Sequence, residues 1–331
     1  YAIQKGYFKE ALDKYANDHP QSFQAGKITP FRIADYGCAD GTNTIPLYDH
    51  LINLIRNKSP TLPIELVCND LEGTNWELLF KNMKHLKEQH SEVYFSVAAG
   101  SFYTQVVPEK SVDLAITCTA IHWIQKAQTF LHCMLYRTRG MDELFSSEDT
   151  DAWNQQAAED LQLFLKLRHH ELKPGGTLFM TTLGIDAPLS DINKTELKMD
   201  AARIPRALDV LKTHNLDHKK VEFQTPTVER CLADYLAHID NPQAKYEVLQ
   251  STTKYFTLGY VLPLLQNGDT ETYYQIEVDF ASSVVKPFFE AKLRQCGVDD
   301  EEKVGQIARE LIMEQYQHLK TADVDSLVKE M

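Results

Sequence analysis

The sequence predicts an α/β fold built on a parallel β-sheet. Strand-like and helix-like segments alternate through residues 31–182, which is the pattern of βαβ units. The strand-like segments are continuous apolar runs, as is typical of parallel strands buried on both faces. The first of them leads directly into a turn with two glycines, Gly37 and Gly41, where the backbone can turn sharply and approach a ligand closely.

Each element of this fold is indicated by a local pattern. Short apolar runs rich in β-branched and aromatic residues predict strands, and apolar residues at helical spacing predict helices. The last helix of the series ends before Pro174-Gly175-Gly176, because proline and glycine do not continue a helix. In chain order we expect strand 31–38, helix 44–57, strand 64–69, helix 76–89, strands 93–97 and 112–119, helix 160–172 and strand 177–182.

The pattern divides the chain into three regions. Residues 1–183 are expected to form the cofactor-binding α/β domain. Helical patterns dominate from Gly184 onward, so residues 184–270 are expected to form a mainly helical substrate cap. Residues 271–331 are expected to return to the core sheet, through a strand at 272–280, and to end in a C-terminal helix.

Composition excludes some classes of partner. The 331 residues include 34 Lys and Arg against 47 Asp and Glu, a formal net charge of −13. This balance argues against nucleic acid and against an anionic membrane surface as the main partner. No apolar run approaches the length of a membrane span. The six cysteines form no C-x-x-C pair, which indicates a reducing compartment and hence a cytoplasmic location.

The turn after the first strand indicates the kind of cofactor. Asp35 lies two residues before Gly37, and a carboxylate there opposes the pyrophosphate of a dinucleotide. A cationic ligand without phosphate fits better, and S-adenosylmethionine, with an amino group and a sulfonium, is such a ligand. The alternative is an ordinary strand-to-helix turn with helpful glycines.

Two further strand ends carry groups that suit an adenosine. Asp70 ends the second strand, where a carboxylate can accept hydrogen bonds from both ribose hydroxyls; alternatively it is the N-cap of the next helix. Ser101 and Phe102 follow the third strand, and a hydroxyl beside an aromatic face suits an adenine. A loop aromatic that packs on the core is the alternative for Phe102.

The fourth strand ends in Thr119-Ala-Ile-His122-Trp123, where open α/β sheets place their ligand crevice. The indole N–H of Trp123 is a donor that can bind a carboxylate oxygen, and its ring can form a pocket wall. His122 can do the same or act as a base near neutral pH. Core packing is the alternative for both. The sequence shows no metal-ligand spacing and no Ser-His-Asp pattern.

Together these motifs resemble the salicylate, benzoate and theobromine (SABATH) family of S-adenosylmethionine-dependent methyltransferases. The matching segments occur in family order: IADYGCADGTN at 33–43, NDL at 69–71, GSFY at 100–103, HW at 122–123, a helix with its PGG turn at 159–176, and SVVKP at 283–287. The resemblance implies a Rossmann-like class I methyltransferase sheet with a helical cap, often as a homodimer. It implies cofactor contacts from Asp35, Gly37, Asn43, Asp70, Leu71, Ser101 and Phe102.

The resemblance also implies a substrate site, with two differences. Trp123 and the adjacent His122 would contact the acceptor and are the candidate catalytic pair. Phe8 stands where the family has a glutamine that holds the substrate carboxylate, and Thr119 stands where several members have a tyrosine. Both positions are therefore candidate substrate contacts, but half of the usual carboxylate clamp is missing.

The expected function is methyl transfer to a small-molecule carboxylic acid, giving a methyl ester by direct in-line displacement. A carboxylate is ionised at pH 7 and needs no general base. N-methylation of a small heterocycle is the alternative within the class. A non-catalytic S-adenosylmethionine-binding protein is an alternative of another class. A nicotinamide-dependent oxidoreductase is disfavoured, because the turn lacks the G-x-G-x-x-G spacing.

Overall fold

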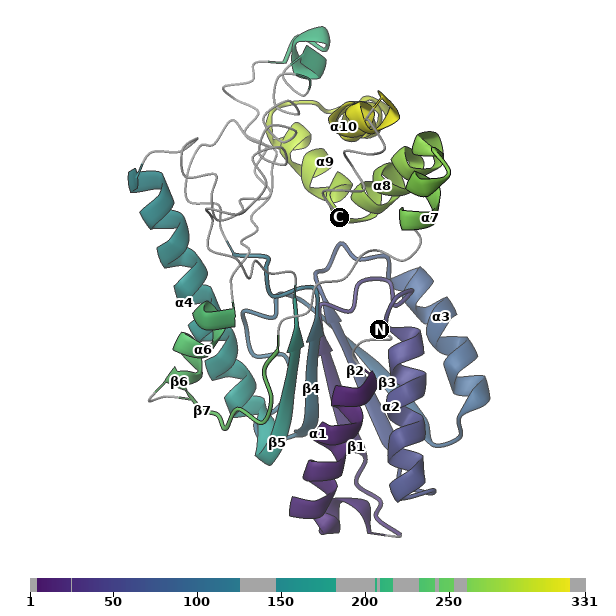
Figure 1. Cartoon of the computed structure of the whole chain (residues 1–331), viewed down its shortest axis with the longest axis vertical. Coiled ribbons are helices and arrows are strands. Elements are labelled where there is room, and N and C mark those ends of the chain that lie inside the picture. The colour runs from purple at the N-terminus through teal and green to yellow at the C-terminus, as the bar shows by residue number, and fades with distance from the viewer. Residues whose placement is uncertain are drawn as a thin grey trace. The chain divides into compact units, whose positions relative to one another are not determined.

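The computed structural model of the chain describes residues 5–24, 26–125, 147–182, 206, 209–216, 232–241, 244–252 and 261–321 (Figure 1). These residues belong to two compact units. The described part of the first unit comprises residues up to 125, 157–182 and 232–251. The described part of the second unit comprises 147–156, 206, 209–216, 252 and 261–321.

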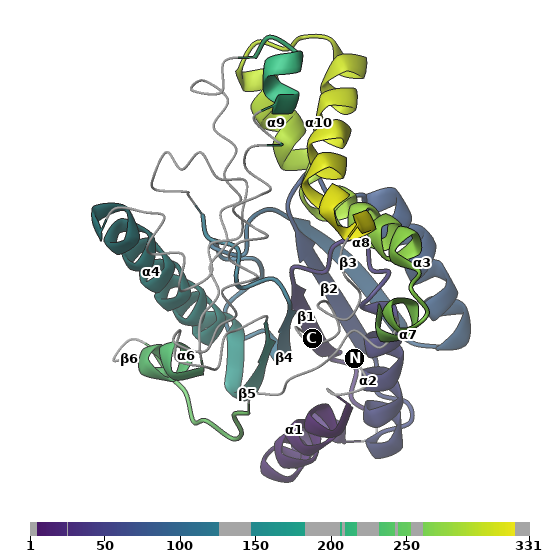
Figure 2. The same ribbon diagram turned by 45° about the horizontal axis from the view of Figure 1, so that its top comes forward.

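The first unit is built on a five-stranded sheet in which every pairing is parallel, as the sequence predicted. The strands lie in the order β3-β2-β1-β4-β5, so the most buried strands, β1, β2 and β4, are in the interior of the sheet (Figure 2). The strand bounds are β1 Phe31–Tyr36, β2 Ile64–Asp70, β3 Val93–Ala99, β4 Val112–Cys118 and β5 Leu172–Thr181.

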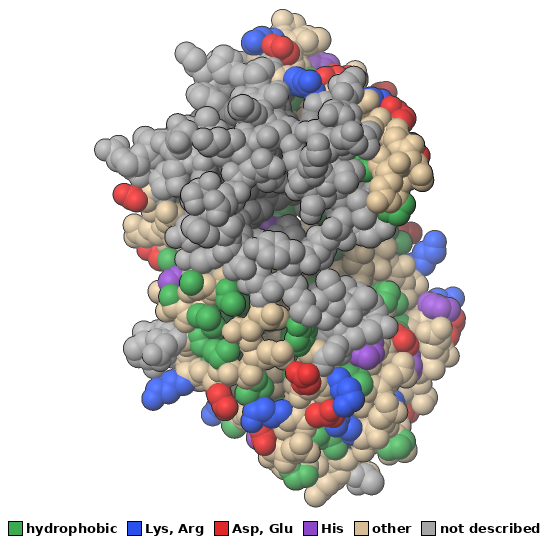
Figure 3. All heavy atoms as spheres, in the orientation of Figure 1, with side chains coloured by type: hydrophobic (Ala, Val, Ile, Leu, Met, Phe, Trp, Pro, Cys, Tyr) green, Lys and Arg blue, Asp and Glu red, His purple; other side chains and the backbone are tan. Residues whose placement is uncertain are grey.

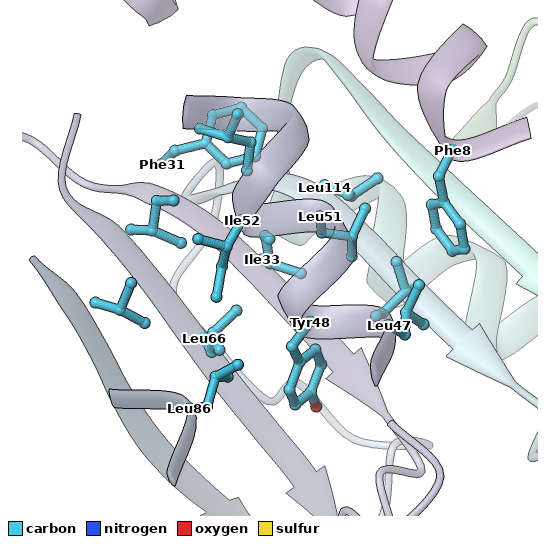
Figure 4. Close-up of a cluster of buried hydrophobic side chains, with 14 of the residues drawn as sticks. Phe8, Phe31, Ile33, Leu47, Tyr48, Leu51, Ile52, Leu66, Leu86 and Leu114 are labelled. Atoms are coloured by element: carbon cyan, nitrogen blue, oxygen red, sulfur yellow. The ribbon is translucent and has the colours of Figure 1, made fainter. Parts of the chain in front are cut away.

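One face of the sheet is covered by α1 (Lys5–Asp18), α2 (Ile45–Lys58) and α3 (Trp76–Gln89). Each of these helices buries apolar residues at helical spacing, for example Leu47, Leu51 and Ile55 on α2. Figure 4 shows these side chains meeting those of β1, β2 and β4. Tyr48 lies at the edge of the cluster with its hydroxyl directed away from the aliphatic side chains (Figure 4).

The opposite face is covered by α4 (Ser147–Glu171) through Leu161, Phe164 and Leu165. The segment after residue 230 also packs here. Tyr235 on α6 (Leu232–Ile239) belongs to the same apolar cluster, and the hydroxyl of Tyr246 donates to the Leu165 carbonyl at 2.8 Å. Two short antiparallel strands, β6 (Asp240–Asn241) and β7 (Ala244–Lys245), lie between α6 and Tyr246 in the chain. Residues that we expected in the cap, 232–251, therefore belong to the first unit.

The helix that precedes β5 ends at Glu171, close to its predicted end, but β5 begins earlier than predicted. It starts at Leu172 and continues through Pro174-Gly175-Gly176, where its register against β4 shifts. Gly175 has φ +75°, and a Cβ there would overlap the ring of His19. The left-handed φ favours glycine here, and the His19 ring, just before the 3₁₀ turn at Pro20–Phe23 (η1), would have to move to admit a side chain.

A buried carboxylate fastens α1 to the sheet. Asp113, on β4, accepts hydrogen bonds from the hydroxyl of Tyr15 (2.7 Å), the backbone N–H of Arg32 (2.9 Å) and the ammonium of Lys173 (2.5 Å). The side chain of Asp113 is fully buried. Three donors compensate this buried charge, which would otherwise be costly.

The second unit is helical. Its described elements are α7 (Val261–Gln266), α8 (Thr270–Val284), α9 (Lys286–Gln295), α10 (Glu301–Tyr316) and a terminal 3₁₀ turn, η4 (Gln317–Thr321). The strand expected at 272–280 is wrong, because these residues lie inside α8. Tyr274, Val278, Ala281 and Val285 recur at helical spacing and are buried against α10 in one cluster. The expected C-terminal helix is α10, which begins at Glu301.

The described surface shows no segregation of charge over the face drawn in Figure 3. Lys and Arg side chains lie among Asp and Glu side chains there. Among the described helices, none combines the length and apolar character that a membrane crossing requires. Most of the expected cap, including 184–205 and 217–231, lies outside the described residues.

Candidate functional site

The candidate site lies at the carboxyl edge of the sheet, because four parallel strands end there and each is followed by a turn that sequence analysis selected. The turns follow β1, β2, β3 and β4. The chain leaves β1 toward β2 on one side, whereas β4 lies on the other side of β1. This is the topological switch point at which open α/β sheets bind ligands.

The turn after β1 is held by backbone hydrogen bonds to the end of β2. The N–H groups of Gly37 and Cys38 donate to the Asn69 carbonyl at 2.8 and 3.1 Å. Gly37 has φ +92°, and a Cβ there would overlap the Cβ of Ala120 in the turn after β4. Only glycine allows this approach, so the turns after β1 and β4 meet at Gly37.

Asp35 is buried beneath this turn. One carboxylate oxygen, Oδ2, accepts a hydrogen bond from the Tyr48 hydroxyl at 2.7 Å, and the other, Oδ1, has no hydrogen-bond partner in the described structure. Burial raises the pKa of Asp35 to about 7. The Tyr48 hydrogen bond lowers this pKa, and the nearby charge of Asp70 raises it by a smaller amount. A buried carboxylate with one oxygen that lacks a hydrogen-bond partner is suited to a cationic ligand group.

Asp70 connects the turns after β1 and β2. Its Oδ2 accepts from the Ala39 N–H at 2.7 Å, and its Oδ1 accepts from the Leu71 N–H at 2.8 Å and the Thr74 hydroxyl at 3.0 Å. The N-cap of α3 is Asn75, whose side chain accepts from the Leu78 N–H. The alternative of Asp70 as the helix N-cap is therefore excluded.

Asn69 is a site residue whose role sequence analysis missed. It is almost fully buried, and its side-chain amide donates to the carbonyls of Ala98 (2.7 Å) and Gly100 (2.8 Å), in and after β3. Its own carbonyl holds the turn after β1. One asparagine thus links three strand ends. The signal was present in the N-D-L motif, where only the aspartate was given a role.

The loop after β3 carries Ser101 and Phe102. The Ser101 hydroxyl accepts a hydrogen bond from the Tyr103 N–H at 3.1 Å, and the Ser101 carbonyl accepts two from Thr104. The Phe102 ring is half-buried and meets the Phe164 ring edge-on, with centroids 5.7 Å apart. It also lies close to Gly37, so the loop borders the turn after β1.

The turn after β4 carries the candidate acceptor residues. Thr119 is exposed and has φ +57°, and its N–H donates to the Thr181 carbonyl at 2.8 Å. His122 is buried and Trp123 is half-buried, with ring centroids 5.6 Å apart. The turn is fastened to α4 by Asp160, which accepts from the backbone and side-chain N–H groups of Gln125 at 2.7 and 2.6 Å.

The remaining predicted residues differ in exposure. Asn43 and Leu71 are exposed at the carboxyl edge, Leu71 by 46%. Phe8 is fully buried on α1 and stacks on Phe179 of β5, with ring centroids 3.8 Å apart. Its described contacts are those of a core residue, and its role as a substrate contact stays a prediction. No group of three or more potential metal ligands occurs among the described residues.

The strand order, the glycine turn after β1 and the acidic residues at the ends of β1 and β2 define a Rossmann-like methyltransferase fold. A solved structure described as loganic acid methyltransferase with SAH superposes with a TM-score of 0.69 at 19% identity, over 95% of this chain and 86% of that one. Residues 7–303 match the family described as SAM-dependent carboxyl methyltransferase, and the chain belongs to this family. The resemblance inferred from the motifs is confirmed.

Curated relatives match over shorter segments. A probable S-adenosylmethionine-dependent methyltransferase of Arabidopsis thaliana is 30% identical over 181 residues, which is 47% of this chain and 46% of that protein. A benzoic acid/salicylic acid carboxyl methyltransferase of Petunia hybrida is 28% identical over 172 residues, 46% of each chain. The matched segments thus span about half the length of these relatives.

Gly37→Ala is expected to destabilise the fold by about 2–4 kcal/mol, because it combines a left-handed φ with an overlap at Ala120. In the double variant Gly37→Ala/Ala120→Gly the overlap is absent, so part of the lost stability should be recovered. Gly26→Ala is the matched control, since Gly26 has φ +77° but no atom near its missing Cβ. Urea unfolding measures all three. Equal losses for Gly37→Ala and Gly26→Ala would show that the two turns do not meet as described.

Asp35→Asn is expected to stabilise the cofactor-free protein relative to wild type as the pH rises. The pKa of Asp35 in the folded protein lies above its ordinary value of 3.8. The wild-type protein therefore keeps the stability that the neutral carboxyl group contributes below pH 3.8, and loses it as the pH rises toward 7. Between pH 5.5 and pH 8 the difference should grow by about 2 kcal/mol in urea unfolding. Tyr48→Phe removes a hydrogen bond that lowers this pKa and should extend the loss to higher pH. A pH-independent difference would contradict the burial argument.

Proposed function

We propose that this chain is an S-adenosylmethionine-dependent methyltransferase that converts a small-molecule carboxylic acid into its methyl ester. The observation that carries the proposal is family membership over residues 7–303, in a chain whose selected residues lie at one edge of the sheet. The named relatives support the acceptor class: their names give benzoic, salicylic, gibberellic and loganic acids as acceptors.

The cofactor residues fit the chemical groups of S-adenosylmethionine. Oδ1 of Asp35, which has no hydrogen-bond partner in the described structure, would receive the ammonium group, and the backbone of Gly37 would border the cofactor. Asp70 would accept from the ribose hydroxyls, since its carboxylate oxygens retain acceptor capacity. Ser101 and Phe102 would border the adenine, and the exposed Asn43 and Leu71 would complete the cofactor site.

The bound cofactor supplies a methyl group on a sulfonium centre. The chain itself has to hold the acceptor carboxylate in line with that methyl group. Such positioning can supply on the order of 7–11 kcal/mol of rate acceleration. Trp123 and His122 would orient the carboxylate, and the exposed Thr119 would border it. Because the carboxylate is already ionised, His122 would act as a hydrogen-bond partner and not as a base.

We further propose that the protein acts in the cytoplasm as a homodimer, with no nucleic-acid or membrane partner. Three of the described cysteines are free thiols: Cys38 and Cys68 are buried, and Cys118 is half-buried. The net charge of −13 and the mixed described surface support the absence of a nucleic-acid partner. Light scattering on a size-exclusion column tests the dimer directly.

A methyl-transfer assay with labelled cofactor, over aromatic, aliphatic and terpenoid acids and N-heterocycles, tests the activity. The expected product is a methyl ester, so mild alkali should release the label as methanol. A label that survives alkali would show that the product is an N-methyl compound and not an ester. Cofactor binding without turnover on any acceptor would show that the chain is a non-catalytic binding protein and not an enzyme. Asp70→Ala should weaken cofactor binding at least about tenfold.

Cofactor affinity is expected to depend on pH through Asp35. The ammonium group needs an ionised carboxylate, and the pKa of Asp35 in the cofactor-free protein is about 7. Affinity should therefore rise between about pH 5.5 and 7.5, as the carboxyl group of Asp35 ionises. Calorimetry with S-adenosylhomocysteine, which keeps the amino group, measures this dependence. The rise in affinity should disappear in Asp35→Asn. A wild-type affinity that does not change below pH 7.5 would show that Asp35 does not bind the cofactor.

A further inference from the structure

A buried ion pair lies behind the loop that follows β3. Arg168 and Glu171 are one helical turn apart at the end of α4, and the side chains of both are completely buried. Two hydrogen bonds join them, from Nε to Oε2 at 2.8 Å and from Nη2 to Oε1 at 3.0 Å. A buried pair of this kind is weak as a source of stability, since desolvation offsets the attraction. Its remaining hydrogen bonds therefore indicate what it does.

Those hydrogen bonds go to one loop. Arg168 donates to the carbonyl oxygens of Phe102 (2.7 Å) and Thr104 (3.1 Å). Glu171 accepts from the N–H groups of Val106 (2.5 Å) and Val107 (3.3 Å) through Oε1. The pair thus binds two acceptors and two donors of the backbone between residues 102 and 107. A loop fixed at four backbone groups has little conformational freedom.

The pair itself is fixed by aromatic side chains. The Tyr36 hydroxyl donates to Glu171 Oε2 at 2.7 Å, and the guanidinium carbon of Arg168 lies 4.0 Å from the centre of the Tyr36 ring. The Phe164 ring is 4.9 Å away and also contacts Phe102. Because Tyr36 is the last residue of β1, the pair connects the loop to the central strand of the sheet.

The same loop reaches the acceptor side. The Tyr103 hydroxyl donates to the Trp123 carbonyl at 2.5 Å, so the loop contacts the turn after β4. Its first residues are Ser101 and Phe102, and the Phe102 carbonyl is one of the two acceptors of Arg168. The backbone of a proposed adenine contact is therefore bonded directly to the buried pair.

We propose that Arg168 and Glu171, supported by Tyr36, are positioning residues that hold the loop of residues 101–107 in the conformation in which Ser101 and Phe102 meet the adenine. They touch neither cofactor nor acceptor and act through the loop backbone. The proposal rests on the proposed function, since it needs S-adenosylmethionine as the ligand. It predicts that loosening the pair weakens binding of the adenosine part of the cofactor in a protein that is still folded.

The chain offers a matched control for a merely structural effect. Tyr15 and Tyr36 are both buried, and each donates to a buried carboxylate at 2.7 Å. Tyr15 donates to Asp113, whose described hydrogen bonds are with α1, β1 and β5 and not with the turns of the candidate site. Tyr36→Phe and Tyr15→Phe therefore remove equivalent hydrogen bonds, but only Tyr36→Phe removes one from the positioning pair.

The experiment is calorimetric binding of S-adenosylhomocysteine and of methylthioadenosine, which keeps the adenosine but lacks the amino acid. Both ligands should bind at least about tenfold more weakly to Arg168→Lys and Glu171→Gln, and measurably more weakly to Tyr36→Phe. Tyr15→Phe should bind both like wild type. Asp35→Asn should lose affinity for S-adenosylhomocysteine alone. Melting temperatures are measured in parallel, so that binding is compared on folded protein.

The outcomes separate the two proposals. If wild type binds neither ligand, the proposed function fails, and the positioning role fails with it. If wild type binds both and the Arg168, Glu171 and Tyr36 variants bind them equally well, the positioning role alone is overturned. Equal weakening by Tyr36→Phe and Tyr15→Phe would also overturn it. Tyr36→Phe is the smallest change and decides the question if the two charge-altering variants do not fold.

Discussion

The candidate site depends on the hydrogen bonds of Asn69. Its carbonyl holds the turn after β1, and its amide holds the end of β3 and the residue that follows. Parallel strands bring their carboxyl ends to one edge, but they do not by themselves orient the loops that leave that edge. A single buried amide does so here, and leaving its donors unmatched would cost on the order of 1–3 kcal/mol each. Asp70, the next residue, extends the same link to Ala39.

The electrostatics of the edge follow from burial and not from net charge. Asp35 lies under a glycine turn, and one of its oxygens has no hydrogen-bond partner in the described structure. Burial raises its pKa to about 7, and a bound cation would favour the ionised form. Removing the charge of Asp70 would lower the pKa of Asp35, whereas removing the Tyr48 hydrogen bond would raise it. The formal charge of −13 sums over the whole chain, whereas the ligand would meet a small number of buried groups.

Much of the first unit could be predicted because its signals are local. Helix 76–89 has the predicted bounds, and the ends of the strands that lead to the turns of the candidate site were placed within two residues. Residues 272–280 were misassigned because β-branched and aromatic residues suggested a strand, whereas their helical spacing decided the structure. The burial of Phe8 against Phe179 and the roles of Asn69, Arg168 and Glu171 are contacts between distant segments. A single sequence does not show such contacts.

The hydrogen bond between Tyr36 and Glu171 spans 135 residues, and those from Arg168 to the loop span 64 and 66. Contacts at such separations close only after long segments of chain have been ordered, and ribosomes add residues in sequence. The loop of residues 101–107 is therefore synthesised well before the helix end that fixes it. The folding nascent chain can form β1 to β4 first, but it acquires a rigid ligand edge only once residue 171 has emerged and α4 has docked.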